Sequence, residues 1–149
     1  MAVITPRNRV RNRIVIALHR IGLPIGPMAL LTVAGRRSGR PRTTPVAPVV
    51  IAGSRYLVEA YPGSDWVRNA RAAGRGTLTR GRQRQEVDLT EVPSADRGPI
   101  LREFPTQNPR GAGAFVRNGI VESPTPEAFA QAASRCPVFR ATPRRADPA

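Results

Sequence analysis

The 149-residue chain has the length of one domain and can bury a sizeable core without a disulfide framework. Its formal net charge of +14 comes entirely from arginine, because the chain has no lysine, and such an excess attracts phosphates, carboxylates, nucleic acid or an anionic membrane surface. Cys136 is the only cysteine, which excludes an intramolecular disulfide, and no apolar run reaches the ~18 residues that span a bilayer. We therefore expect a single cytoplasmic domain over residues 1–149 with a buried, unreactive Cys136.

The first predicted element is a basic amphipathic helix over residues 7–22. Val10, Ile14 and Ala17 recur at helical spacing, and most of the arginines lie off that stripe. Such a helix can pack on the domain, close over a site or lie on anionic lipid, so a membrane-associated protein stays open as an alternative.

Short strands joined by tight turns dominate the rest of the chain. In chain order, we expect strands over 28–35, 43–53 and 55–61, a helix over 64–74 capped by Ser64, strands over 76–81 and 82–92, a helix over 93–104 weakened or broken by Gly98 and Pro99, a loop over 106–121, a helix over 124–135, a strand over 137–142 and a frayed tail over 143–149. This order lacks the strand–helix alternation of a doubly wound fold. It indicates a mainly β protein with a few helices (α+β), built as a small barrel or sheet.

Four arginines lie between the first two predicted strands, in the sequence GRRSGRPR. Arginine offers planar paired donors that match phosphate and carboxylate oxygens, and the glycines of the turn let backbone N–H groups approach an anion. The turn is therefore a candidate phosphate cradle. The alternative is a solvated turn in a very basic protein.

Residues that carry chemistry are scarce elsewhere. The chain has no GxGxxG, no P-loop, no CxxC pair and no cluster of histidines and carboxylates for a metal, and its one histidine is His19. An enzyme of this composition needs a cofactor to carry the reaction. Nucleic-acid binding is disfavoured, because only seven aromatic residues are present and none lies in the arginine turn.

Two motifs at a fixed separation, TVAGRRSGRPRTTP and DWVRNARAAG, are followed by a strand that ends in VDLTEV. Over residues 29–92 this combination resembles the deazaflavin-dependent nitroreductase family, which consists of mainly actinobacterial flavin/deazaflavin oxidoreductases. The resemblance implies a split β-barrel of the FMN-binding, pyridoxamine-phosphate-oxidase-like type. It also implies coenzyme F420, a deazaflavin with a phosphodiester and an oligoglutamate tail, with FMN as the alternative.

The family's cofactor contacts carry over to positions that match its motifs. The loop that holds the phosphate and tail corresponds to Arg36, Arg37, Ser38 and Gly39, with Arg42 following it. The expected contacts near the ring system are Pro45, Ala60, Tyr61, Trp66, Val67 and Asn69.

The reaction implied is hydride transfer from the reduced deazaflavin to a quinone, a nitroaromatic compound or a similar electron-poor acceptor. Tyr61 is a candidate contact to that acceptor or a packing residue. Better-known family members carry a basic residue where this chain has Pro62. The aromatic residues that line the acceptor pocket near the C-terminus in some members have no clear match here, unless Phe115 or Phe139 substitutes. A non-catalytic lipid- or cofactor-binding barrel and an FMN-dependent reductase remain as alternatives, and a homodimer remains open.

Overall fold

The computed structural model describes residues 13, 16 and 28–144. The helix expected over 7–22 lies outside the described residues, except that Arg13 and Ile16 are both helical. Within the part of the chain that is described, no helix combines the length and the apolar character that crossing a bilayer requires.

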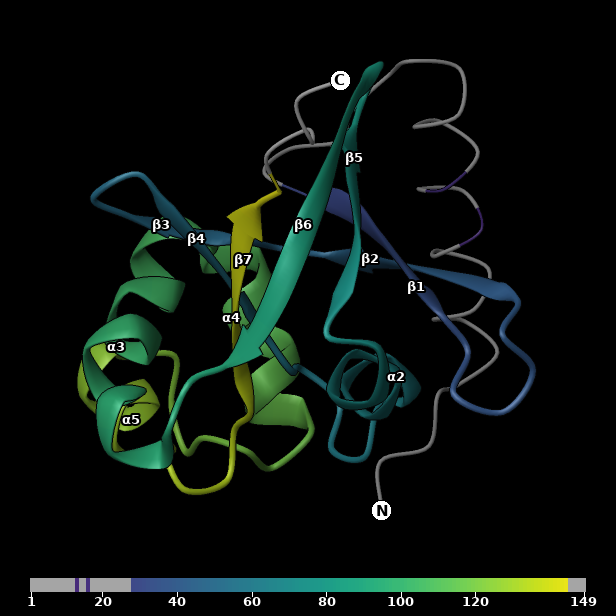
Figure 1. The fold of residues 1–149 in the computed structure, drawn as a ribbon. Helices are drawn as coiled ribbons and strands as arrows, with labels where there is room; N and C mark the ends of the chain where they lie inside the picture. The colour runs from purple at the N-terminus through teal and green to yellow at the C-terminus, as the bar shows by residue number, and fades with distance from the viewer. Residues whose placement is uncertain (1–12, 14–15, 17–27, 145–149) are drawn as a thin grey trace.

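Seven strands form one antiparallel sheet in the order β2-β1-β5-β6-β7-β4-β3 (Figure 1). Alternation gives β6 one buried face, since Val87 and Leu89 are buried and their neighbours Glu86 and Asp88 are exposed, whereas β1 is a nearly continuous apolar run whose first three residues are all buried. The strands are β1 Ala29–Ala34, β2 Pro41–Val46, β3 Val49–Ile51, β4 Ser54–Val58, β5 Arg75–Arg80, β6 Gln83–Glu91 and β7 Val138–Pro143.

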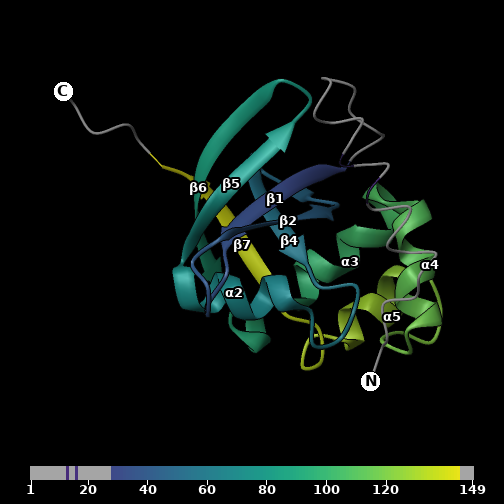
Figure 2. The same ribbon diagram turned by 90° about the vertical axis from the view of Figure 1, so that its right-hand side faces the viewer.

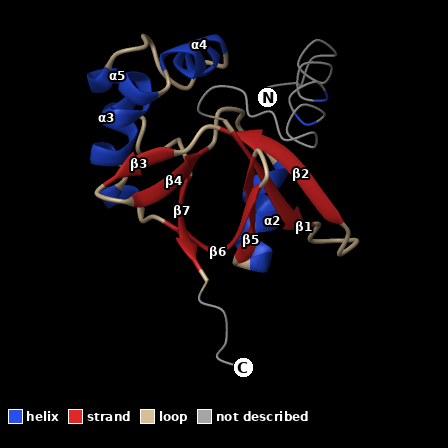
Figure 3. Ribbon diagram, turned by 90° about the horizontal axis from the view of Figure 1, so that it is seen from above, coloured by secondary structure: helices blue, strands red, loops and turns tan. Residues whose placement is uncertain are grey.

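The sheet curls because its two edge strands are consecutive in the chain. β2 ends at Val46 and β3 begins at Val49, so the two edges lie within three Cα–Cα steps, about 11 Å. Viewed from above, the strands follow a curved path consistent with this short link (Figure 3). The expectation of one continuous strand over 43–53 was wrong, because Ala47 and Pro48 interrupt it, and a proline nitrogen cannot donate to a strand ladder.

Helix α2, Asp65–Ala73, follows the prediction closely. It ends at Gly74, whose φ of 67° is left-handed and whose N–H donates to the Ala70 carbonyl at 2.8 Å. The expected side-chain cap was wrong: the Ser64 hydroxyl donates to the Tyr61 carbonyl instead of accepting from the helix. In two perpendicular views α2 lies apart from the other described helices (Figures 1 and 2).

The helical region after β6 differs most from the sequence prediction. A 3₁₀ turn at Ser94–Asp96 precedes α3 Gly98–Gln107, α4 Pro109–Arg117 and α5 Pro126–Gln131. Gly98 and Pro99 therefore begin a helix rather than break one, as proline suits a first turn. The loop expected over 106–121 was wrong, because burying Ala112 and Phe115 of α4 outweighs the poor helix propensity of its glycines.

Buried side chains form two clusters. The barrel cluster contains Leu31, Leu57, Val87 and Phe139, and it packs against α2. The helical cluster lies between the sheet and α3–α5. Its centre is three phenylalanines with ring centroids 4.7 to 5.5 Å apart: Phe104, Phe115 and Phe129.

The C-terminal strand is longer than predicted. Pro143 still pairs with Val87, and the Arg144 N–H donates to the Glu86 carbonyl at 2.9 Å, so the tail does not begin at 143. Residues 145–149 lie outside the described part.

Candidate functional site

The arginine turn, residues 35–42, leaves β1 and enters β2 at the α2 end of the barrel (Figure 1). The Gly35 N–H donates to the Arg40 carbonyl at 2.8 Å, and the Gly39 N–H donates to the Gly35 carbonyl at 2.8 Å. Gly39 has a φ of 71°, a conformation that explains the glycine at this position. The Ser38 hydroxyl oxygen accepts from the Arg40 N–H at 3.2 Å, which leaves its proton free to donate to a ligand.

Arg36 ties this turn to helix α2. Its backbone N–H and its Nη1 both donate to the Asn69 Oδ1, at 3.1 and 2.9 Å, and its Nη2 contacts the Asp65 Oδ1 at 3.1 Å. The Asn69 side chain is buried, with 3 % of its surface exposed, so this tie is the strong part of the contact. Asp65 is 79 % exposed and adds little. Of the residues predicted from the two motifs, Arg36 and Asn69 are thus brought into contact.

The other three arginines of the turn are exposed: Arg37, Arg40 and Arg42. Among the described residues, no carboxylate lies within 4.0 Å of any of their guanidinium groups. Like charges held this close repel one another, and a bound polyanion relieves that repulsion. The turn therefore has the charge that an anionic ligand needs.

The loop from β4 to α2 surrounds a buried carboxylate. Glu59 is 5 % exposed, and its Oε2 accepts from the Ser64 N–H at 3.2 Å. Burial raises the pKa of Glu59, against the opposing effects of the loop N–H groups and of Arg71. The Ala60 carbonyl accepts from the Asn118 Nδ2 at 2.7 Å, so α4 also holds this loop. Ala60 and Tyr61 are half-buried here.

The predicted ring contacts divide into packed and partly open side chains. Val67 is 2 % exposed and belongs to the barrel cluster, so its side chain packs in the core. Trp66 is partly buried, with its ring centroid 5.7 Å from that of Phe139 at an interplanar angle of 59°. Pro45 is half-buried in β2, opposite Leu30.

Phe115 and Phe139 do not substitute for the family's acceptor-lining aromatic residues. Each is 1 % exposed, and each packs against other rings in one of the two core clusters. That expectation was wrong, because the hydrophobic effect places these large apolar side chains inside the protein.

Cys136 is buried as predicted. Its Sγ donates to the Glu59 carbonyl at 3.4 Å, and burial raises the pKa of its thiol to about 12. The thiol therefore stays protonated at neutral pH and is a poor nucleophile.

Sequence reasoning missed the tie between Arg36 and Asn69 and the buried carboxylate of Glu59. A signal for the first was available: Asp65 and Asn69 are four residues apart, and polar side chains at that spacing lie on one face of a helix. The burial of Glu59 has no such signal, because the fold of the following loop decides it.

Solved structures share this fold at low sequence identity. One described as an F420-H2-dependent reductase is 20 % identical, with a TM-score of 0.54 over 77 % of this chain and 93 % of that one. One described as a domain-swapped dimer is 19 % identical, with a TM-score of 0.55 over 92 % and 99 %. One described as a putative pyridoxamine 5′-phosphate oxidase from Listeria innocua is 8 % identical, with a TM-score of 0.52 over 89 % and 93 %. These likenesses confirm the split β-barrel.

Family assignment comes from the sequence. No curated protein sequence matches the chain. Residues 8–114, more than half of the chain, match the family described as F420H(2)-dependent quinone reductase, which confirms the resemblance found in the two motifs. The residues present also fit the coenzyme, since three unneutralised guanidiniums and the Ser38 hydroxyl suit its phosphate and carboxylates. The chain therefore belongs to the F420H2-dependent quinone reductase family, which makes it an oxidoreductase that uses F420 and leaves the FMN alternative unneeded.

Proposed function

We propose that this chain reduces a quinone or a nitroaromatic compound and that the arginine turn binds the anionic part of its coenzyme. Bound F420H2 supplies a hydride, which is the chemistry that this protein's side chains lack. The chain's own part is to bind the coenzyme, to fix its orientation and to exclude water around the transfer.

The proposal is supported mainly by the different contacts that the four arginines of the turn make. Arg36 is fixed to α2 through the buried Asn69, whereas Arg37, Arg40 and Arg42 have no carboxylate within ion-pair distance in the described chain. A turn held rigidly on one side and charged on the other is pre-organised for a phosphodiester and an oligoglutamate tail.

Helix α2 connects the anion site to the place proposed for the ring. The helix that holds Arg36 through Asn69 also carries Trp66 in its first turn, three residues before Asn69. A coenzyme gripped at the turn would therefore lie beside the partly buried indole of Trp66 and the half-buried Tyr61. We assign to the Tyr61 phenol a hydrogen bond to the acceptor.

Titration and turnover together test this function. The purified chain is titrated separately with F420 and FMN while the absorbance of each is followed, and it is then supplied with F420H2 and either menadione or a nitroimidazole. We expect saturable binding of F420, weaker binding of FMN and oxidation of F420H2 that depends on the acceptor. Binding without turnover of either acceptor class would favour the non-catalytic barrel, and absence of F420 binding would overturn the site assignment.

We propose a homodimer as the assembly, because one structure with the same fold is described as a domain-swapped dimer. Light scattering coupled to size exclusion measures the mass directly, and a mass near 16.1 kDa at micromolar concentration contradicts the proposal.

A further inference from the structure

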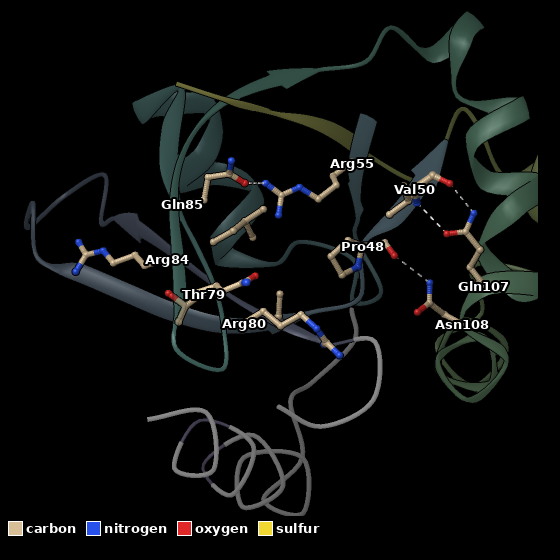
Figure 4. A pocket seen from close by; sticks show the side chains of 12 residues that line it. Pro48, Val50, Arg55, Thr79, Arg80, Arg84, Gln85, Gln107 and Asn108 are labelled. Atoms are coloured by element: carbon tan, nitrogen blue, oxygen red, sulfur yellow. Dashed lines mark hydrogen bonds between the residues drawn. The ribbon is translucent and has the colours of Figure 1, made fainter. Parts of the chain in front are cut away.

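A second candidate site lies at the end of the barrel away from the arginine turn. A cavity of about 690 Å³ opens between the start of β1, the β5–β6 hairpin, β3, β4 and the end of α3 (Figure 4). None of the residues predicted to bind the coenzyme lines it. Its volume is typical of small-molecule sites.

The charge around this cavity has one sign. Its described lining contains Arg55, Arg80 and Arg84 and no aspartate or glutamate. Arg55 reaches across one side and donates to Gln85, and the Arg80 Nη1 donates to the Met28 carbonyl at 2.7 Å, whereas Arg84 extends outward (Figure 4). Each guanidinium has five N–H donors, so Arg55 and Arg80 keep donors for a ligand.

A buried acceptor on the cavity wall lacks a partner. Asn108 is 2 % exposed, and its Nδ2 donates to the Pro48 carbonyl at 3.4 Å. Its Oδ1 has no hydrogen-bond partner among the described residues and is itself almost fully covered, while the side chain lies on the side of the cavity toward Arg80 (Figure 4). The neighbouring Gln107 is satisfied, because its amide exchanges two bonds of 2.8 Å with the Val50 backbone. Leaving a buried acceptor unpaired is costly, so the site suits a ligand with a donor.

We propose that this cavity binds a small anionic molecule that carries a carboxylate or phosphate and, several ångströms away, an O–H or N–H donor. The anion lies between Arg55 and Arg80, and a small rotation of the Asn108 side chain toward the cavity lets its Oδ1 accept from the donor. The cavity shares no residue with the predicted coenzyme contacts, and the arginine turn lies at the other end of β1.

Pairs of probes test both halves of this recognition. Binding of 3-hydroxybenzoate is compared with that of benzoate, and binding of 3-hydroxyphenyl phosphate with that of phenyl phosphate, by calorimetry and by amide chemical shifts of the full chain. We expect the hydroxylated member of at least one pair to bind about tenfold more tightly, as one added hydrogen bond allows. Shifts should concentrate near Thr79 and Asn108, and saturating F420 should leave them in place. Tighter binding of the benzoates indicates that the site prefers a carboxylate, and tighter binding of the phenyl phosphates indicates that it prefers a phosphate.

Two variants test whether Arg80 binds the anion. Arg80→Gln is compared with Arg75→Gln, which removes an exposed arginine from the other end of the same strand and changes the net charge equally. We expect Arg80→Gln to weaken the anion about tenfold and Arg75→Gln to change it less than twofold. Equal binding within both probe pairs, equal effects of the two variants, or displacement by F420 would each overturn the proposal.

Discussion

Two groups of arginines in this protein differ in whether a carboxylate of the described chain pairs with them. At the end of β6, Glu91 accepts from the Arg71 Nε and Nη2, both at 2.8 Å, and from the Arg97 Nη2 at 3.3 Å. Those hydrogen bonds, that of Arg71 above all, hold the pKa of Glu91 below its usual value. In the arginine turn, Arg37 and Arg42 have no such carboxylate in the described chain.

The difference shows how one side-chain type serves both folding and binding. Where the chain supplies the counter-charge, as at Glu91, the arginines hold α2 and the segment after β6 to the barrel. Where the described part of the chain offers no carboxylate, as at Arg37 and Arg42, a bound ligand can supply the counter-charge. The following experiments separate these two uses.

The largest expected effect is on coenzyme binding. Arg37→Ala combined with Arg42→Ala removes two unneutralised cations, so we expect the Kd for F420 to rise about hundredfold, with little change in the free energy of unfolding. The control replaces Arg110 and Arg117, two exposed arginines of α4, and should leave F420 binding within about threefold. A similar loss in both pairs would mean that net charge alone governs binding.

Glu91→Gln tests whether the arginines that pair with Glu91 stabilise the fold. Removing the negative charge leaves Arg71 and Arg97 without their shared partner, and we expect the free energy of unfolding in urea to fall by about 2 kcal/mol at pH 7. Because the pKa of Glu91 is lowered in the folded state, its contribution is present above the ordinary value of 4.5 and is lost as the pH falls below it. Glu103→Gln, at an exposed glutamate, is the control. A variant as stable as its parent would remove Glu91 from this role.

Asn69→Ala should affect both the stability of the fold and the binding of the coenzyme. It takes away the acceptor of both Arg36 hydrogen bonds, so we expect the free energy of unfolding to fall by about 1.5 kcal/mol and the Kd for F420 to rise less than in the double variant. Asp65→Asn changes the exposed partner of the same arginine and should cost under about 0.5 kcal/mol. A larger loss of unfolding free energy in Asp65→Asn than in Asn69→Ala would contradict this prediction.

The smallest effect concerns the buried Glu59. Its pKa is raised in the folded state, so its ionisation lowers stability as the pH rises from the ordinary value of 4.5 through the raised one. Glu59→Gln keeps an oxygen for the Ser64 N–H without the charge, and we expect a gain below about 1 kcal/mol at pH 7 that disappears at pH 4. Thermal unfolding at the two pH values measures it, and a loss at pH 7 would contradict the sign.

Local patterns in the sequence predicted the strands and α2 well. Alternation along β6 and the left-handed Gly74 after α2 both follow from short stretches of chain. Helix α4 was missed because its support is tertiary: Phe115 packs on two rings from other helices, against the local signals of Gly111 and Gly113. The arginine turn was found as a candidate site, but its rigid attachment through Asn69 depends on the position of α2 against β1.

The two-residue link between β2 and β3 has a consequence for how the protein melts. Val46, before the link, belongs to the barrel cluster, and Val49, after it, belongs to the helical cluster. The strands β4 and β7 join the clusters in the same way, because Leu57 and Phe139 belong to the barrel cluster and their neighbours Val58 and Val138 to the helical cluster, so heat or denaturant should unfold both in one concerted transition. Extending the link with flexible glycines should therefore lower the midpoint of that transition, through the added loop entropy, and leave it concerted.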